Sequence, residues 1–226
     1  MSGRRSFARG PAAYRRGTPQ HPPSGKAFLV VTEGEKTEPQ YIKALCQRLQ
    51  LGAADVEIVH PDGTDPLTLT RRAMELRDAR RREAKKGLAV AYDEVWVVFD
   101  LEKPHGERRR QAAEARAFPG VGDIQFAVSN PAFEFWLLLH GKFTTRPFLD
   151  AAAVIEPLKD HWADYSKGQA PSQAFLEGIR DAVSRAQRCR EHHETTGGDG
   201  NPSTDVDRLA RSLNSATRPH LQFAFD

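Results

Sequence analysis

The 226 residues carry a formal net charge of +3, and this length suits one sizeable α/β domain with at most a small appendage. The sequence has no apolar run near the roughly 18 residues that span a bilayer, no secretory signal, and no CxxC spacing around its two cysteines, Cys46 and Cys189. These features exclude membrane-spanning and disulfide-stabilised secreted proteins, and they predict a cytoplasmic protein without membrane association.

The N-terminal residues differ in composition from the rest of the chain. Residues 1–25 are rich in Pro, Gly, Ser and Ala, and we expect them to form a disordered basic tail. Residues 1–26 contain six basic residues and no acidic one, which leaves a net charge of −3 for residues 27–226. The tail can bind nucleic-acid phosphates, or it can be a solubilising extension without a ligand.

Short apolar runs alternate with helical patterns over the next part of the chain. The runs predict buried strands, and the segments between them predict helices, one of them long and basic near its end. This alternation is typical of a parallel sheet of about four strands flanked by helices. The predicted strands lie at 28–31, 56–59, 94–100 and 124–129, and the predicted helices lie at 38–51, 66–86 and 107–118.

The chain after residue 150 shows helical patterns only. Helices are predicted at 151–158 and 172–194, with a last one that ends near Leu213, after a Gly-rich break. We therefore divide the chain into the tail, an α/β core at 26–150, and a helical C-terminal region at 151–226 that packs on the core.

Acidic residues follow three of the predicted strands. Glu33 comes after the first, Asp100 and Glu102 end the third, and Glu134 follows the fourth. In open parallel sheets, ligands bind outside the carboxyl ends of the strands. Carboxylates gathered at that edge repel one another unless a cation lies among them, so the pattern predicts a divalent-metal site.

Four segments in chain order resemble the RloB-like protein family. They are LVVTEGEKTEPQY at 29–41, VWVVFDLE at 95–102, SNPAFEFWLLLH at 129–140 and NPSTDVDRL at 201–209. The resemblance covers about residues 26–213 and implies a Toprim-like core, similar to that of topoisomerases, primases and OLD-family nucleases. It also implies a bacterial phage-defence protein of the abortive-infection type, paired with an ATPase of the AAA or ABC type.

The resemblance assigns roles to the acidic residues. It implies Glu33 as general acid or base, and Asp100 and Glu102 as ligands of Mg²⁺ or Mn²⁺. The second acid of that pair is Glu102 where the family pattern has Asp, and a longer carboxylate can still reach an ion. Lys36 is expected to contact the substrate phosphate as part of the catalytic group. Glu134 either completes the metal shell or caps a helix that begins at Pro131.

Three further residues are substrate-binding candidates, namely Asn130, His140 and Lys167. The preferred hypothesis is a Mg²⁺-dependent nuclease that acts on RNA, including transfer RNA, or on DNA, and that can form a homodimer. The rival is a non-catalytic module that binds a metal or ligand and docks on the ATPase. A third reading is a primase-like nucleotidyl-transfer enzyme, for which the sequence shows no dedicated triphosphate-binding residues.

Overall fold

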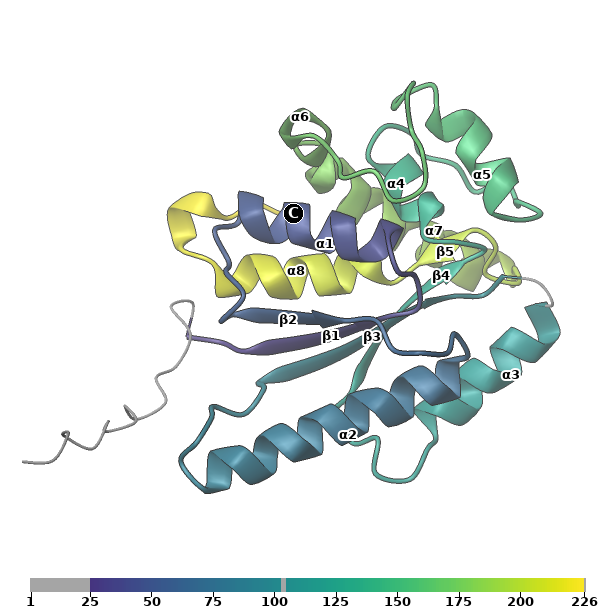
Figure 1. The fold of residues 1–226 in the computed structure, drawn as a ribbon. Coiled ribbons are helices and arrows are strands. Elements are labelled where there is room, and N and C mark those ends of the chain that lie inside the picture. Colours follow the sequence, from purple (N-terminus) through teal and green to yellow (C-terminus); the bar gives the residue numbers. More distant parts are fainter. Residues whose placement is uncertain (1–24, 103–104, 226) are drawn as a thin grey trace, which may run out of the picture.

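The computed structural model describes residues 25–102 and 105–225, and a five-stranded sheet lies at its centre (Figure 1). The strand order is β2-β1-β3-β4-β5. The first four strands are parallel, as predicted, and β5 pairs antiparallel with β4. The strands are β1 (Phe28–Thr32), β2 (Val56–Val59), β3 (Glu94–Asp100), β4 (Gln125–Asn130) and β5 (Ser203–Thr204).

Successive residues of the central strands point to opposite faces of the sheet and enter two separate cores. In β1, Phe28 and Val30 belong to one core, whereas Leu29 and Val31 belong to the other. Because both faces are covered, the whole strand is buried, which explains why its sequence is a continuous apolar run.

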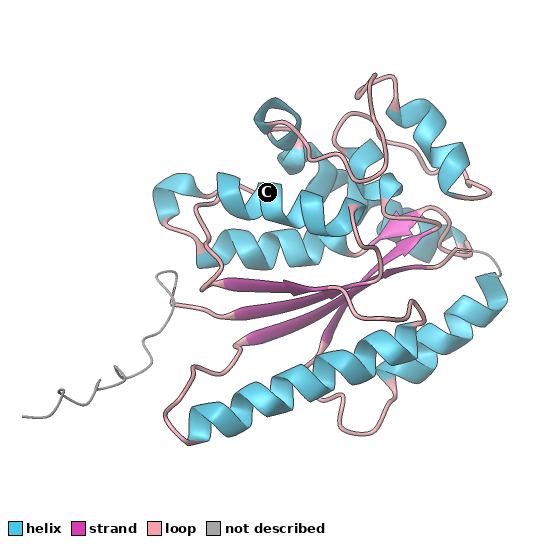
Figure 2. Ribbon diagram, viewed as in Figure 1, coloured by secondary structure: helices cyan, strands magenta, loops and turns pink. Residues whose placement is uncertain are grey.

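Helices cover both faces of this sheet (Figure 2). The face that carries Phe28 packs against α1, α4, α7 and α8, and the opposite face packs against α2 and α3. This mixed α/β architecture with C-terminal helices confirms the predicted fold class and is consistent with the Toprim-like fold. The helices are α1 (Thr37–Arg48), α2 (Pro66–Lys85), α3 (His105–Arg116), α4 (Glu134–Leu139), α5 (Ala151–Leu158), α6 (Gln173–Leu176), α7 (Ile179–Thr196), α8 (Val206–Ala216) and the 3-10 turn Pro219–Leu221.

The structure differs from the expected elements in three places. The segment at 172–194 contains two helices, α6 and α7, which meet at Gly178. A side chain at Gly178 would place its Cβ 2.8 Å from the carbonyl oxygen of His140, so the break is a point of close backbone approach. The helix expected from Pro131 begins at Glu134, after the cis peptide that precedes Pro131. The C-terminal region also contributes β5, which the helical patterns did not predict.

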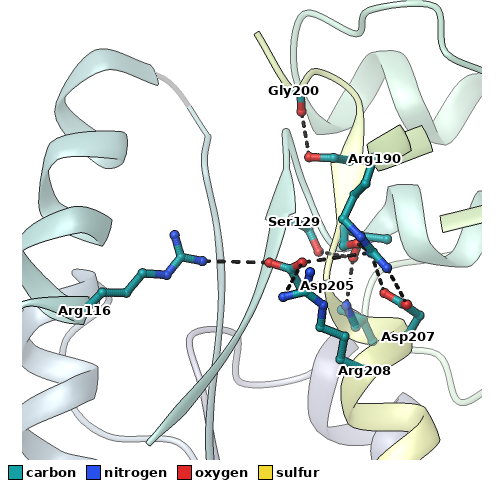
Figure 3. Close-up of polar contacts among 10 residues, drawn as sticks. Arg116, Ser129, Arg190, Gly200, Asp205, Asp207 and Arg208 are labelled. Atoms are coloured by element: carbon teal, nitrogen blue, oxygen red, sulfur yellow. Dashed lines mark hydrogen bonds and ion pairs between the residues drawn. The ribbon is translucent and has the colours of Figure 1, made fainter. Parts of the chain in front are cut away.

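Ion pairs attach the C-terminal region around β5 (Figure 3). Arg190 of α7 forms a two-pronged pair with Asp207 of α8, with both nitrogen–oxygen distances 2.7 Å. Asp205 lies between Arg116 of α3, Arg190 and Arg208, at 3.8, 3.9 and 3.5 Å. These contacts connect α3, on one face of the sheet, to α7 and α8 on the other.

Two further predictions concern the N-terminal tail and membrane association. The predicted basic tail falls almost entirely within residues 1–24, which lie outside the described residues. In the part that is described, no helix combines the length and the apolar character needed to cross a bilayer.

Candidate active site

A cleft of about 420 Å³ opens at the carboxyl ends of β1 and β3, next to the first turns of α1 and α4. It contains six of the eight residues predicted as site residues, whereas Asn130 and His140 do not line it. The lining residues are Glu33, Gly34, Glu35, Lys36, Thr37, Glu38, His60, Thr64, Asp100, Glu102, Phe133, Glu134 and Lys167.

Glu33 is held at both carboxylate oxygens. Its backbone N–H continues the β1–β3 hydrogen bonding by donating a 2.9 Å hydrogen bond to the carbonyl oxygen of Val98. Oε2 accepts a 2.9 Å hydrogen bond from the backbone N–H of Asp100, and Oε1 pairs with the guanidinium of Arg108. Burial raises the pKa of Glu33 above its usual value, and the Asp100 and Arg108 contacts oppose that rise. The result is a fixed carboxylate at the strand end.

Asp100 is a buried carboxylate that is repelled by three acidic neighbours in the cleft. Burial raises its pKa well above the usual value, and the nearby charges of Glu38, Glu33 and Glu134 raise it further, against one backbone hydrogen bond from Phe133. Its Oδ1 atom is buried and has no hydrogen-bond partner among the described residues. Such an orphaned oxygen favours binding of a proton or a cation.

Glu38 joins this group, although the sequence indicated only that it begins a predicted helix. Oε1 of Glu38 accepts a 3.1 Å hydrogen bond from the backbone N–H of Gly34, and the side chain is buried. Burial raises the pKa of Glu38, as do the charges of Glu134 and Glu33. The turn at Gly34 makes this contact possible, because a Cβ at that position would lie 2.0 Å from Oε2 of Glu38.

Glu134 lies on the other side of the cleft, where a loop from the C-terminal region contacts it. Its Oε1 accepts a 3.0 Å hydrogen bond from the hydroxyl of Tyr165, and the ammonium of Lys167 lies 3.7 Å away. The same loop is fixed to α1, because the backbone N–H of Gly168 donates a 3.1 Å hydrogen bond to Oγ1 of Thr37. Glu134 therefore faces the cleft rather than capping a helix at Pro131.

Asn130 and His140 lie away from the cleft. Nδ2 of Asn130 donates a 2.8 Å hydrogen bond to the carbonyl oxygen of Gly200, which holds the loop before β5. His140 is buried between α1 and α6, and its ring stacks on Phe175 with centroids 4.7 Å apart. All residues of α4 are buried, and His140, which directly follows its last residue Leu139, also enters the core. Neither residue lines this cleft, and a role for them in substrate binding stays a prediction.

The cleft supplies the donors that a magnesium ion prefers, namely several carboxylate oxygens. Glu38, Glu33 and Glu134 are close enough to Asp100 to raise its pKa. The buried Oδ1 of Asp100, which has no partner among the described residues, fits a cation at this position. Within residues 25–102 and 105–225, however, no three His, Cys, Asp or Glu side chains already form a ligating cluster. The residue types fit a divalent cation, although the described side chains do not stand as a formed ligand set.

Comparison with known protein families gives a match over most of the chain. The model of the family described as RloB-like protein matches residues 28–213, which extends from β1 into α8 and includes every residue that lines the cleft. No curated protein and no solved structure gives a significant match.

Proposed function

The chain belongs to the RloB-like protein family, and from this premise we propose that it is a Mg²⁺-dependent nuclease. It would hydrolyse phosphodiester bonds of RNA or DNA in the cytoplasm, as the effector of a phage-defence system with a partner ATPase. The observation that carries this proposal is the gathering of buried carboxylates at the ends of parallel strands, around an Asp100 oxygen that has no partner among the described residues.

Each cleft residue has a defined task in this proposal. Glu33, which burial makes more basic than an ordinary glutamate, accepts a proton from the attacking water or returns one to the leaving oxygen. Asp100, Glu102 and Glu134 would hold the cation, which would neutralise the phosphate and the developing charge on the leaving oxygen. Lys36 and Lys167 line the same cleft and bring positive charge to the phosphate.

The repulsion between these carboxylates destabilises the folded chain, so we attribute their clustering to a function and not to stability. A folded chain would gain by replacing one of these acids with a neutral residue, because the charges of Glu33, Glu38 and Glu134 all raise the pKa of Asp100. Residues that weaken the fold but converge in a cleft are characteristic of functional sites.

A non-catalytic module is the second candidate, and one observation favours it. The described carboxylates do not stand as a formed ligating cluster, so the cleft can instead serve to dock a basic partner surface or a ligand. On this alternative the protein would bind the ATPase and regulate it without cleaving nucleic acid.

The deciding experiment is cleavage of pooled cellular RNA and plasmid DNA by purified protein, with Mg²⁺, Mn²⁺ or EDTA. Glu33→Ala and Asp100→Ala should abolish metal-dependent cleavage while the fold is retained. Glu35→Ala is the matched control, because Glu35 lies at the rim of the same cleft with 72% of its side chain exposed. Its activity should remain close to that of the unmodified protein.

The assay is repeated with the partner ATPase and ATP when the protein alone is silent. Cleavage that appears only in the mixture, and is lost with Asp100→Ala, supports a nuclease under control of its partner. Silence in both arms, together with ATPase binding that depends on the cleft acids, would replace the nuclease by the docking module.

A further inference from the structure

Helix α3 is highly charged and contributes little to the core. Its buried apolar side chains among the described residues are Ala112 and Ala115. Three of its arginines instead form ion pairs with separate parts of the fold. Arg108 pairs with Glu33, Arg109 pairs with Asp199, and Arg116 pairs with Asp205. Only the first of these three pairs reaches the acidic cleft.

Arg108 differs from the other two arginines in its environment. Its side chain is 15% exposed, compared with 40% for Arg109 and 51% for Arg116. One guanidinium nitrogen, Nη2, contacts Oε1 of Glu33, and the other, Nη1, donates a 3.1 Å hydrogen bond to the carbonyl oxygen of Thr64. The guanidinium therefore bridges the end of β1 and the loop between β2 and α2.

The position of Arg108 relative to the cleft determines what it can do. Glu33 and Thr64 line the cleft, whereas Arg108 is not among its described lining residues. Arg108 thus reaches the cleft through Glu33. The backbone N–H of Asp100 holds the second Glu33 oxygen at 2.9 Å. Together the two contacts fix both oxygens of a carboxylate that is itself only 14% exposed.

We infer that Arg108 is a positioning residue that fixes the orientation of Glu33 for phosphodiester hydrolysis. This inference rests on the proposed function. Arg108 and the backbone N–H of Asp100 each hold one oxygen, so the carboxylate of Glu33 cannot turn away without breaking a contact. An Arg–carboxylate pair of this kind combines charge with fixed geometry, which a lysine provides only in part.

The first test measures kcat and KM for cleavage by Arg108→Gln. We expect kcat to fall about 10–100-fold, as for the loss of groups that orient a catalytic residue, and KM to change little. Arg108→Lys should recover part of the lost kcat. Arg109→Gln and Arg116→Gln are the matched controls, since each removes one ion pair of the same helix away from Glu33. Both should retain nearly full kcat.

Two outcomes of this test would overturn the inference. An equal loss of kcat in Arg108→Gln and Arg109→Gln would mean that the arginine only secures α3. A gain in kcat on removal of Arg108 would mean that the ion pair blocks Glu33 instead of positioning it.

The second test does not depend on cleavage. Melting temperatures are compared for Arg108→Gln, Glu33→Gln and the double variant. If Arg108 holds Glu33, the loss caused by Arg108→Gln becomes smaller once Glu33 is already neutral, because residues in contact give coupled effects. Additive losses would overturn the inference. A wild-type protein that cleaves nothing, alone or with the partner ATPase, defeats the proposed function, whereas this cycle still decides whether Arg108 supports Glu33.

Discussion

The hydroxyl oxygen of Tyr41, on α1, lies 3.1 Å from Nε2 of His140, at the end of α4. The other ring nitrogen, Nδ1, lies 3.1 Å from the carbonyl oxygen of Trp136. A carbonyl oxygen only accepts, so Nδ1 carries the proton, and Nε2 accepts a hydrogen bond from the Tyr41 hydroxyl. The contact joins two core helices through a histidine that is neutral.

This buried histidine predicts a loss of stability in mild acid. Burial lowers the pKa of His140 to about 3, and the charge of Arg185 lowers it too, although the Trp136 contact opposes this. The unfolded chain protonates this histidine near pH 6.5, so between that pH and the folded pKa the unfolded state binds the extra proton and stability falls as pH falls. At about pH 5 the contribution is about 2 kcal/mol.

Urea unfolding at about pH 7 and pH 5 checks this prediction. The drop in unfolding free energy should be smaller in His140→Gln than in the unmodified protein, by about 2 kcal/mol. The other titrating groups are the same in both proteins, so their contribution cancels when the two drops in unfolding free energy are subtracted. Equal drops would show that His140 is accessible to protons in the folded state.

Asp100→Asn should stabilise the protein in EDTA. The substitution removes a carboxylate whose pKa is raised by burial and by three acidic neighbours, while it keeps the shape of the side chain. We expect the melting temperature to rise by about 2–4 °C, which corresponds to about 1 kcal/mol in a chain of this size.

Differential scanning calorimetry in EDTA and in Mg²⁺ tests this prediction. Mg²⁺ should raise the melting temperature of the unmodified protein more than that of Asp100→Asn. Asp62 is exposed and does not line the cleft, so Asp62→Asn serves as control and should leave both values nearly unchanged. A lower melting temperature of Asp100→Asn in EDTA would refute the repulsion between the cleft acids.

Gly168→Ala should disturb Lys36 as well as the backbone. Gly168 has a φ of +84°, and a Cβ there would lie 2.8 Å from Cβ of Lys36. Gly197 has a φ of +65°, and a Cβ there would meet no other atom within 4 Å, so Gly197→Ala isolates the backbone effect. Both variants should lose about 1 kcal/mol from the left-handed conformation, and Gly168→Ala should lose more.

Urea unfolding of the two alanine variants provides this comparison, and nucleic-acid binding in EDTA provides a second one. Only Gly168→Ala should bind more weakly, because the stem of Lys36 must move. Equal losses of stability and equal nucleic-acid binding in the two variants would show that Gly168 does not support the cleft.

Asp207→Ala should be strongly destabilising. Asp207 is 3% exposed and forms both 2.7 Å contacts with Arg190, so its removal leaves a largely buried guanidinium without its main partner (Figure 3). Breaking a buried pair in this way costs about 3–5 kcal/mol. Arg208→Ala removes an exposed contact with Asp205 and should cost less than about 1 kcal/mol. Similar losses in the two variants, measured by urea unfolding, would contradict this assignment.

The central strands could be predicted from the sequence, because their apolar pattern is local and strong. The apolar runs at the central strands are buried on both faces, and such runs have few alternatives in a folded chain. The convergence of Glu33, Asp100 and Glu134 also followed from the sequence, because parallel strands present their carboxyl ends at one edge.

The remaining site residues depend on contacts that no local pattern reveals. Arg108 is 75 positions from Glu33, and the composition of α3 indicated an exposed charged helix without showing which arginine turns inward. Glu38 reaches the cleft only through the turn at Gly34. The strand β5 has two residues, too few for a pattern, and its position follows from pairing with Ser129 and Asn130.

The late position of β5 in the chain also affects the order in which the protein can be completed during synthesis. The cleft acids lie between Glu33 and Glu134, so the ribosome produces them well before it reaches Ser203. A nascent chain of that length lacks β5, which pairs with the outer edge of β4, and it lacks α5 and α7, which pack on α4. Its acidic edge therefore cannot take its final shape until the last part of the chain has emerged, and a prematurely terminated product would carry the cleft acids without the scaffold that aligns them.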